Sequence, residues 1–236
     1  MLKNELIQRS PIRVLEKSIH GGLKKSELGV FTARKGVGKT ACLAHVALDD
    51  LFRENKVLHI SFADNPRHIE SWYEHIFREV ASAYKLEHPS EIYEDVIRHR
   101  LILHFQEKYQ DLEPVKNNIQ AVIEGSRFIP GVIIVDGFSF YDAESKIFQQ
   151  WKQLAMDMNT EIWFSATIRP DDNEVDEEGI PSPVFRFKEF FAVIILLHPM
   201  NEFVDLRLLK DRDSKDLEKL RLKLDPKTLL IANRRV

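Results

Sequence analysis

The chain has 236 residues and a formal net charge of −3, with 44% hydrophobic and 30% charged residues. This balance is typical of a globular protein and excludes a surface built throughout to hold polyanions. The single cysteine, Cys42, excludes an internal disulfide, and neither the polar first ten residues nor the short apolar run at 190–197 suits a signal peptide or a membrane span, so a cytoplasmic protein without a membrane partner is expected.

Short apolar runs alternate with longer stretches of helical spacing along the chain. A lead-in helix is expected within residues 1–20. Strands are predicted at residues 28–33, 57–62, 100–105, 131–136, 161–167, 190–197 and 203–209, and helices at 40–54, 68–85, 115–125 and 143–159. Few residues separate the last two of these strands, which indicates antiparallel neighbours, and residues 220–224 and 229–231 predict a closing hairpin. The pattern predicts one three-layer α/β domain over residues 1–236, with a mostly parallel central sheet and antiparallel strands at its C-terminal end.

Residues 170–183 form the one segment of biased composition, with six carboxylates between two prolines. Such a segment predicts an exposed acidic loop. Two interpretations stay open, namely contact with a basic protein partner or simple solvation.

A glycine-rich segment after the first predicted strand carries the clearest chemistry. Its residues nearly match the phosphate-binding pattern G-x-x-x-x-G-K-[ST], with alanine in place of the first glycine: Ala33, Arg34, Lys35, Gly36, Val37, Gly38, Lys39 and Thr40, followed by Ala41. Glycines let consecutive N–H groups turn inward around an anion, and the next helix adds free N–H groups and a positive dipole end. Lys39 is expected to bridge the β- and γ-phosphates of ATP, and Thr40 to bind Mg²⁺. The alternative is a chance glycine-rich turn.

A carboxylate at the end of a second buried strand would complete such a site. Asp136 ends the run Val132 to Val135 and is expected to hold Mg²⁺ through water. An aspartate that only caps a strand-to-helix turn is the alternative.

Together these motifs resemble the RecA-like ATPases, in particular the branch of the clock ATPase KaiC, RadA-type recombinases and hexameric replicative helicases. The resemblance covers about residues 15–232, and it includes Gly21, Gly22 and Leu23 before the P-loop and the strand that ends at Asp136. It implies a phosphate site at the carboxyl ends of the strands and a homo-oligomeric ring or filament. It also implies that Lys210 and Arg212, which are similar to the family's K-x-R element, contact the γ-phosphate of a neighbouring subunit. A solvated pair in a charged run is the alternative.

Two departures from the family bear on hydrolysis. Relatives carry a water-orienting glutamate where this chain has Ala63, and Asp64 is the candidate replacement although adjacent strand residues point to opposite faces. Relatives also carry a polar sensor after a serine, where this chain has Ala166 between Ser165 and Thr167. Slow hydrolysis is therefore expected, with binding retained.

The sequence supports several functions to different degrees. A slow Mg-ATPase acting as an oligomeric switch or motor is preferred, and a regulatory module that binds nucleotide without effective hydrolysis is the alternative. A helicase- or recombinase-like motor is disfavoured because the acidic loop would repel a phosphate backbone. In favour of such a motor, the loop after Asp136 contains Phe138, Phe140 and Tyr141, aromatic side chains of the kind that can stack on bases. A small-molecule kinase would not explain the K-x-R element.

Overall fold

The computed structural model of the chain describes residues 2–63, 65–106 and 112–233, and these residues contain one nine-stranded sheet. The strand order is β3-β2-β4-β5-β1-β6-β7-β8-β9, in which the first six strands are parallel and the last three alternate in direction. The strands are β1 (Leu28–Arg34), β2 (Val57–Ser61), β3 (Arg100–His104), β4 (Val132–Asp136), β5 (Glu161–Ile168), β6 (Val193–Pro199), β7 (Val204–Asp211), β8 (Leu222–Leu224) and β9 (Ile231–Asn233). The predicted fold, a mostly parallel sheet with antiparallel strands at its C-terminal end, is confirmed.

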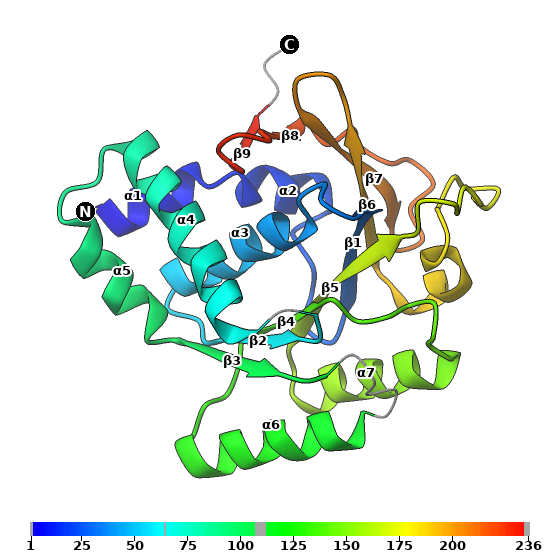
Figure 1. Ribbon diagram of the computed structural model, residues 1–236, viewed down its shortest axis with the longest axis horizontal. Coiled ribbons are helices and arrows are strands. Elements are labelled where there is room, and N and C mark those ends of the chain that lie inside the picture. Colours follow the sequence, from blue (N-terminus) through cyan, green and yellow to red (C-terminus); the bar gives the residue numbers. More distant parts are fainter. Residues whose placement is uncertain (1, 64, 107–111, 234–236) are drawn as a thin grey trace.

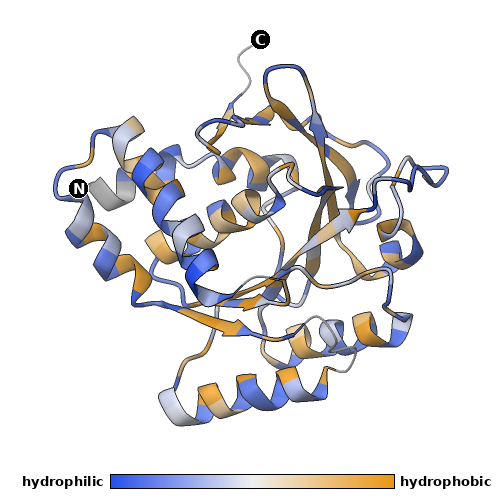
Figure 2. Cartoon of the chain, in the orientation of Figure 1, coloured by the Kyte–Doolittle hydropathy of each residue, from blue (hydrophilic) through white to orange (hydrophobic). Residues whose placement is uncertain are grey.

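Helices cover both faces of the sheet and give the molecule three layers (Figure 1). One face carries α1 (Leu2–Arg9), α2 (Ile12–Ser18), α3 (Lys39–Phe52), α4 (Pro66–Tyr84) and α5 (Pro89–Ile97); the other carries α6 (Glu113–Ser126), α7 (Ser145–Asp157) and the 3-10 helix η1 (Val184–Phe190). Side chains alternate between the layers, since Ile134 joins the hydrophobic cluster on the first face and Ile133 the cluster on the second. Figure 2 accordingly shows central strands that are largely hydrophobic along their length, as expected for a sheet buried on both sides.

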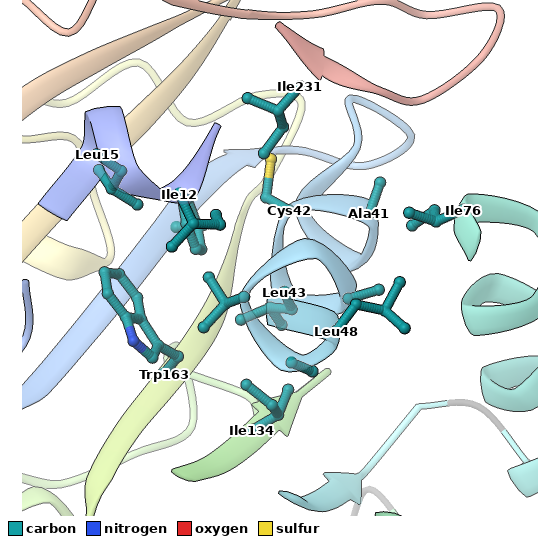
Figure 3. Packing of buried hydrophobic residues seen from close by; sticks show 14 of the residues in the cluster. Ile12, Leu15, Ala41, Cys42, Leu43, Leu48, Ile76, Ile134, Trp163 and Ile231 are labelled. Atoms are coloured by element: carbon teal, nitrogen blue, oxygen red, sulfur yellow. The ribbon is translucent and has the colours of Figure 1, made fainter. Parts of the chain in front are cut away.

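Helix α3, which follows the P-loop, is buried over nearly its whole surface. Its side chains meet Ile12 of α2, Trp163 of β5 and Ile76 of α4 (Figure 3). Cys42 on this helix is fully buried, and burial raises the pKa of its thiol to about 12. The thiol therefore stays protonated and serves as a small core side chain. Such complete burial fixes the position of the helix end that faces the phosphate site.

The N-terminal segment differs from the expected single helix. It forms two helices, α1 and α2, which are interrupted at Ser10 and Pro11. The reason is that proline lacks the N–H that would bond to the preceding turn, and its ring collides with that turn. Helix α5 was not predicted, although Pro89 at its first position and Glu91 in its first turn are ordinary start signals.

Two boundaries near the acidic loop also differ from the prediction. The strand expected from Phe190 begins at Val193, because the preceding residues form η1. The acidic segment is mostly exposed up to Gly179, whereas Ile180 is fully buried and the chain stays buried up to Val184. The apolar residues that close the loop therefore anchor it to the second hydrophobic cluster. No helix among the described residues is long and apolar enough to cross a membrane.

Candidate phosphate-binding site

The glycine-rich segment lies at the carboxyl end of β1 and leads directly into α3, which is the strand–loop–helix context that the motif requires. Gly38 caps the helix with φ at 117°, in the region that favours glycine. A Cβ atom at this position would lie 2.3 Å from Cδ2 of Leu224, so any side chain here would have to displace that leucine. The loop is thus held between its own backbone geometry and the C-terminal hairpin.

Lys39 is buried against the start of the loop, with 8% of its surface exposed. Its ammonium group donates to the carbonyl oxygens of Ala33 and Arg34, at 3.1 and 3.0 Å. Burial lowers the pKa of Lys39 to about 8, and the charge of Asp136 opposes that shift. An anion bound in the loop would stabilise the protonated, charged form of Lys39, which burial otherwise disfavours.

Asp136 and Thr40, which are 96 positions apart, are in direct contact. The Thr40 hydroxyl donates to Oδ2 of Asp136 at 2.8 Å, and the Ser165 hydroxyl donates to its Oδ1. Ser165 in turn accepts the N–H of Gly137 at 3.0 Å. Strand order explains this geometry, because β5 lies between β4 and β1 and places Ser165 beside both neighbours. Ser165 therefore orients the carboxylate at the end of β4.

The donor set at this point suits Mg²⁺. A hydroxyl and one carboxylate are hard oxygen ligands, and Mg²⁺ usually takes one or two such groups and completes its shell with water and phosphate. No group of three or more histidine, cysteine or acidic side chains with metal-site geometry occurs among the described residues. Thr40 and Asp136 would hold the ion, which would neutralise phosphate charge.

No model of a known protein family matches the chain, and no curated protein matches it.

A cleft of about 1110 Å³ opens over the P-loop. Of the residues predicted to bind nucleotide, those that line it are Lys35, Gly36, Gly38, Lys39 and Thr40, together with Asp136. The other four do not line it: Ala33 and Ala41 are buried in the core, Val37 is partly buried against the first hydrophobic cluster, and Arg34 donates to Asn173 of the acidic loop at 2.8 Å. The volume is slightly above the usual range for small-ligand pockets, which is about 300–1,000 Å³.

Ala63 lines this cleft and is exposed, so the position at which the sequence resemblance expects a glutamate faces the phosphate site. Gly137 packs closely against it, since a Cβ on Gly137 would lie 2.4 Å from Cβ of Ala63. Asp64, the predicted replacement, lies outside the described residues. Ala63 itself can neither orient nor deprotonate a water molecule.

Lys210 and Arg212 lie at the opposite end of the sheet from the P-loop of their own chain. Asp211 pairs with Val193, which pairs with Gly29 at the start of β1, about 17 Å along the strand from Arg34. The Lys210 ammonium group donates to the backbone carbonyls of Lys188 and Phe191, at 2.8 and 2.6 Å. These two residues therefore cannot contact the cleft of their own subunit.

The guanidinium group of Arg212 makes five hydrogen bonds within its own chain. It is bidentate to Glu27 at 3.0 and 2.7 Å, and it also donates to Asp211 and to the carbonyls of Ile19 and Gly22. A guanidinium has five N–H donors, so all of them are used. A contact with a neighbouring subunit would require some of these bonds to break.

Tyr141, Arg169 and Leu229 of the C-terminal hairpin also line the cleft. The sequence suggested a role for Tyr141 only as an aromatic residue that could stack on bases. Phe138 and Phe140 also border the cleft, but they are only 7% and 2% exposed and pack in the second hydrophobic cluster, so they offer little surface for stacking on bases. An arginine directly after a strand next to the P-loop strand was the available signal for Arg169.

Proposed function

We propose that this chain is a RecA-like P-loop protein that binds Mg-ATP and hydrolyses it slowly, as an oligomeric switch or motor. The observation that carries the proposal is the contact between Thr40 and Asp136, next to the buried ammonium group of Lys39. A chance glycine-rich turn would not bring a hydroxyl, a carboxylate and a lysine from two strand ends together. These are the parts from which P-loop proteins build a Mg-triphosphate site.

Slow turnover follows from what stands opposite the P-loop. A water-orienting carboxylate contributes about 10²–10⁴-fold to such a reaction, and the cleft has Ala63 where relatives have that group. The same observation favours the second candidate, a regulatory module that binds nucleotide without effective hydrolysis. The slow ATPase and the regulatory module would differ in the rate of single-turnover ATP hydrolysis, so a measurement of that rate distinguishes them.

The oligomeric part of the proposal rests on the family resemblance and on the position of Lys210 and Arg212 far from their own cleft. Light scattering with and without Mg-ATP tests it, and a monomer under both conditions would contradict it. A nucleic-acid motor is disfavoured, because the acidic loop carries exposed carboxylates such as Glu174 and Glu177, which would repel a phosphate backbone. Tight and steeply salt-dependent binding of single-stranded DNA would reverse that preference.

The main experiment measures thermal unfolding with excess Mg-ATP. A ligand at about 100 times its Kd stabilises the folded state by about 2.7 kcal/mol, which raises the melting temperature of a chain of this size by about 5–10 °C. Lys39→Ala should remove this shift because it deletes the phosphate-binding ammonium group. Lys24→Ala, an exposed lysine outside the cleft, is the matched control and should keep the shift.

Direct calorimetric titration with Mg-ATP completes the test. We expect binding by the wild-type chain and by Lys24→Ala, and binding weakened at least a hundredfold in Lys39→Ala, which is about 2.7 kcal/mol. A wild-type chain that neither binds Mg-ATP nor gains stability from it would overturn the proposal.

A further inference from the structure

Arg169 enters the cleft from the strand that lies between the two halves of the phosphate site. It follows β5 directly, and β5 pairs with β1 so that Ile168 lies opposite Arg34. The residue is exposed and lines the cleft together with Lys39, Thr40 and Asp136. Its position is therefore set by the central sheet, at the same end as the P-loop.

The ring of Tyr141 holds the Arg169 guanidinium in place. The guanidinium carbon lies 4.0 Å from the centre of the ring, within range of a cation–π interaction. The Tyr141 hydroxyl accepts the backbone N–H of Arg169 at 3.1 Å and donates to Asp172 at 2.7 Å. Hydrogen bonds from Ser182 and Tyr141 lower the pKa of Asp172, to which the charge of Arg169 also contributes, so this anchor stays ionised. Tyr141 thus fixes both the backbone and the side chain of Arg169.

Stacking leaves the donors of the guanidinium available. Within the part of the chain that the structure describes, they form no hydrogen bond and no ion pair; the recorded contacts are the ring and the longer-range charge of Asp172. Five N–H groups in a planar fork match the oxygens of a phosphate group. An oriented guanidinium with free donors in a phosphate cleft is suited to bind the outermost phosphate.

We propose that Arg169 is the cation that binds the γ-phosphate from within the same subunit, and that Tyr141 is its positioning residue. This proposal rests on the proposed Mg-ATP site. In hydrolysis the bond from Pγ to the β-phosphate oxygen breaks, and a bond from Pγ to the oxygen of water forms. ADP keeps the electron pair of the broken bond, and the proton of the water passes to solvent or phosphate. Arg169 would stabilise the charge on the γ-phosphate oxygens during this transfer.

The test compares a non-hydrolysable ATP analogue with ADP, each with Mg²⁺, by calorimetric titration. Only the analogue carries a γ-phosphate, so Arg169→Gln should weaken its binding about tenfold and change ADP binding less than twofold. Tyr141→Leu should weaken binding of the analogue about threefold through loss of the stacking surface. In single-turnover hydrolysis, Arg169→Gln should be about 10²-fold slower than the wild-type chain.

Arg186→Gln is the matched control, because Arg186 is an exposed arginine that also stacks on a ring, Phe187 at 5.4 Å, outside the cleft. It should leave the preference for the analogue over ADP unchanged. Equal effects of Arg169→Gln on both nucleotides, or none on either, would overturn the role of Arg169, and an unchanged preference in Tyr141→Leu would overturn that of Tyr141. Failure of the Mg-ATP site itself would differ, since the wild-type chain would then bind neither nucleotide.

Discussion

Two arginines at opposite ends of the same sheet show how differently one residue type can be used. Arg169, at the carboxyl end, rests on the face of Tyr141, and its donors bond to none of the residues that the structure describes. Arg212, at the amino end, has a salt bridge to Glu27 and spends all five donors on its own chain. Both follow a strand in the sequence, so the pattern of residues alone does not separate them.

Arg169 and Arg212 differ in whether acceptors within the chain already bind the N–H donors of the guanidinium group. A cation whose donors are all paired contributes to stability, since removing it leaves its partners unpaired. A cation that is held by its flat face and open at its edge costs little to remove but can bind an anion. The contrast therefore predicts that variants at the two ends should affect different measured quantities.

The largest expected effect on stability belongs to Arg212→Ala. It leaves Glu27 and the nearly buried Asp211 without their common partner, and we expect the free energy of unfolding in urea to fall by about 3 kcal/mol. Arg207→Ala is the matched control on β7, the strand that ends just before Arg212. Arg207 is more exposed and pairs with Asp205, so its loss should cost at most about 1 kcal/mol.

The family resemblance offers a competing outcome for the same variant. If Arg212 leaves Glu27 to reach a neighbouring subunit, Arg212→Ala should keep near wild-type stability and lose hydrolysis only in the oligomer. That result would show that Arg212 is not mainly a stabilising residue, and it would support a contact with the γ-phosphate of a neighbouring subunit. Measuring unfolding and single-turnover hydrolysis on one preparation of the variant distinguishes the two outcomes.

The next effect concerns Ala63, at the position where the family that the sequence resembles carries a water-orienting glutamate. Ala63→Glu would place a carboxylate at the exposed position beside Gly137, and we expect single-turnover hydrolysis to become about 10²-fold faster. Ala63→Gln is the control of equal size, which adds no base and should leave the rate unchanged. An unchanged rate in Ala63→Glu, with Mg-ATP still bound, would show that slow hydrolysis has another cause, such as the position of Asp64.

The sequence was sufficient for the sheet and for the centre of the candidate site, for physical reasons. Buried parallel strands are continuous apolar runs, and a P-loop is a local pattern, so both are visible without tertiary contacts. The contact between Thr40 and Asp136 could be anticipated because both residues follow strands whose carboxyl ends share one end of the sheet.

Other features depended on contacts that no local pattern specifies. The stacking of Arg169 on Tyr141 joins two loops, and the burial of Ile180 depends on the second hydrophobic cluster. The division of the first 20 residues into α1 and α2 was visible at Pro11 but was not used in the prediction. The sequence likewise placed Arg212 in a charged run, whereas its partners Ile19, Gly22 and Glu27 are about 190 positions away.

The smallest expected effect concerns a polar group that lies at the same end of the sheet as the cleft but already makes hydrogen bonds within its own chain. It tests whether these bonds, rather than the position near the cleft, determine the role of the group. His45 lies on α3 behind the P-loop, 5% exposed, and its Nε2 is 2.9 Å from the carbonyl oxygen of Leu229 and 3.3 Å from the amide nitrogen of Ile231. Burial lowers the pKa of His45 to about 4 from its ordinary 6.5, while the bond to Leu229 opposes the shift. Like Arg212, His45 makes its hydrogen bonds within its own chain, so we expect it to contribute to the stability of the fold rather than to nucleotide binding.

The sign of the pH dependence follows from the two pKa values. The unfolded chain takes up the proton below pH 6.5 and the folded chain only near pH 4, so the stabilisation is complete above pH 6.5 and is lost as the pH falls. Between pH 7 and pH 5 the loss from His45 is about 2 kcal/mol. His45→Gln should be less sensitive to acid than the wild-type chain by this amount in urea unfolding, whereas a variant of the exposed His104 should match the wild-type chain. If His45→Gln kept the wild-type acid sensitivity but lost Mg-ATP binding, proximity to the cleft rather than occupied donors would decide the role of such groups.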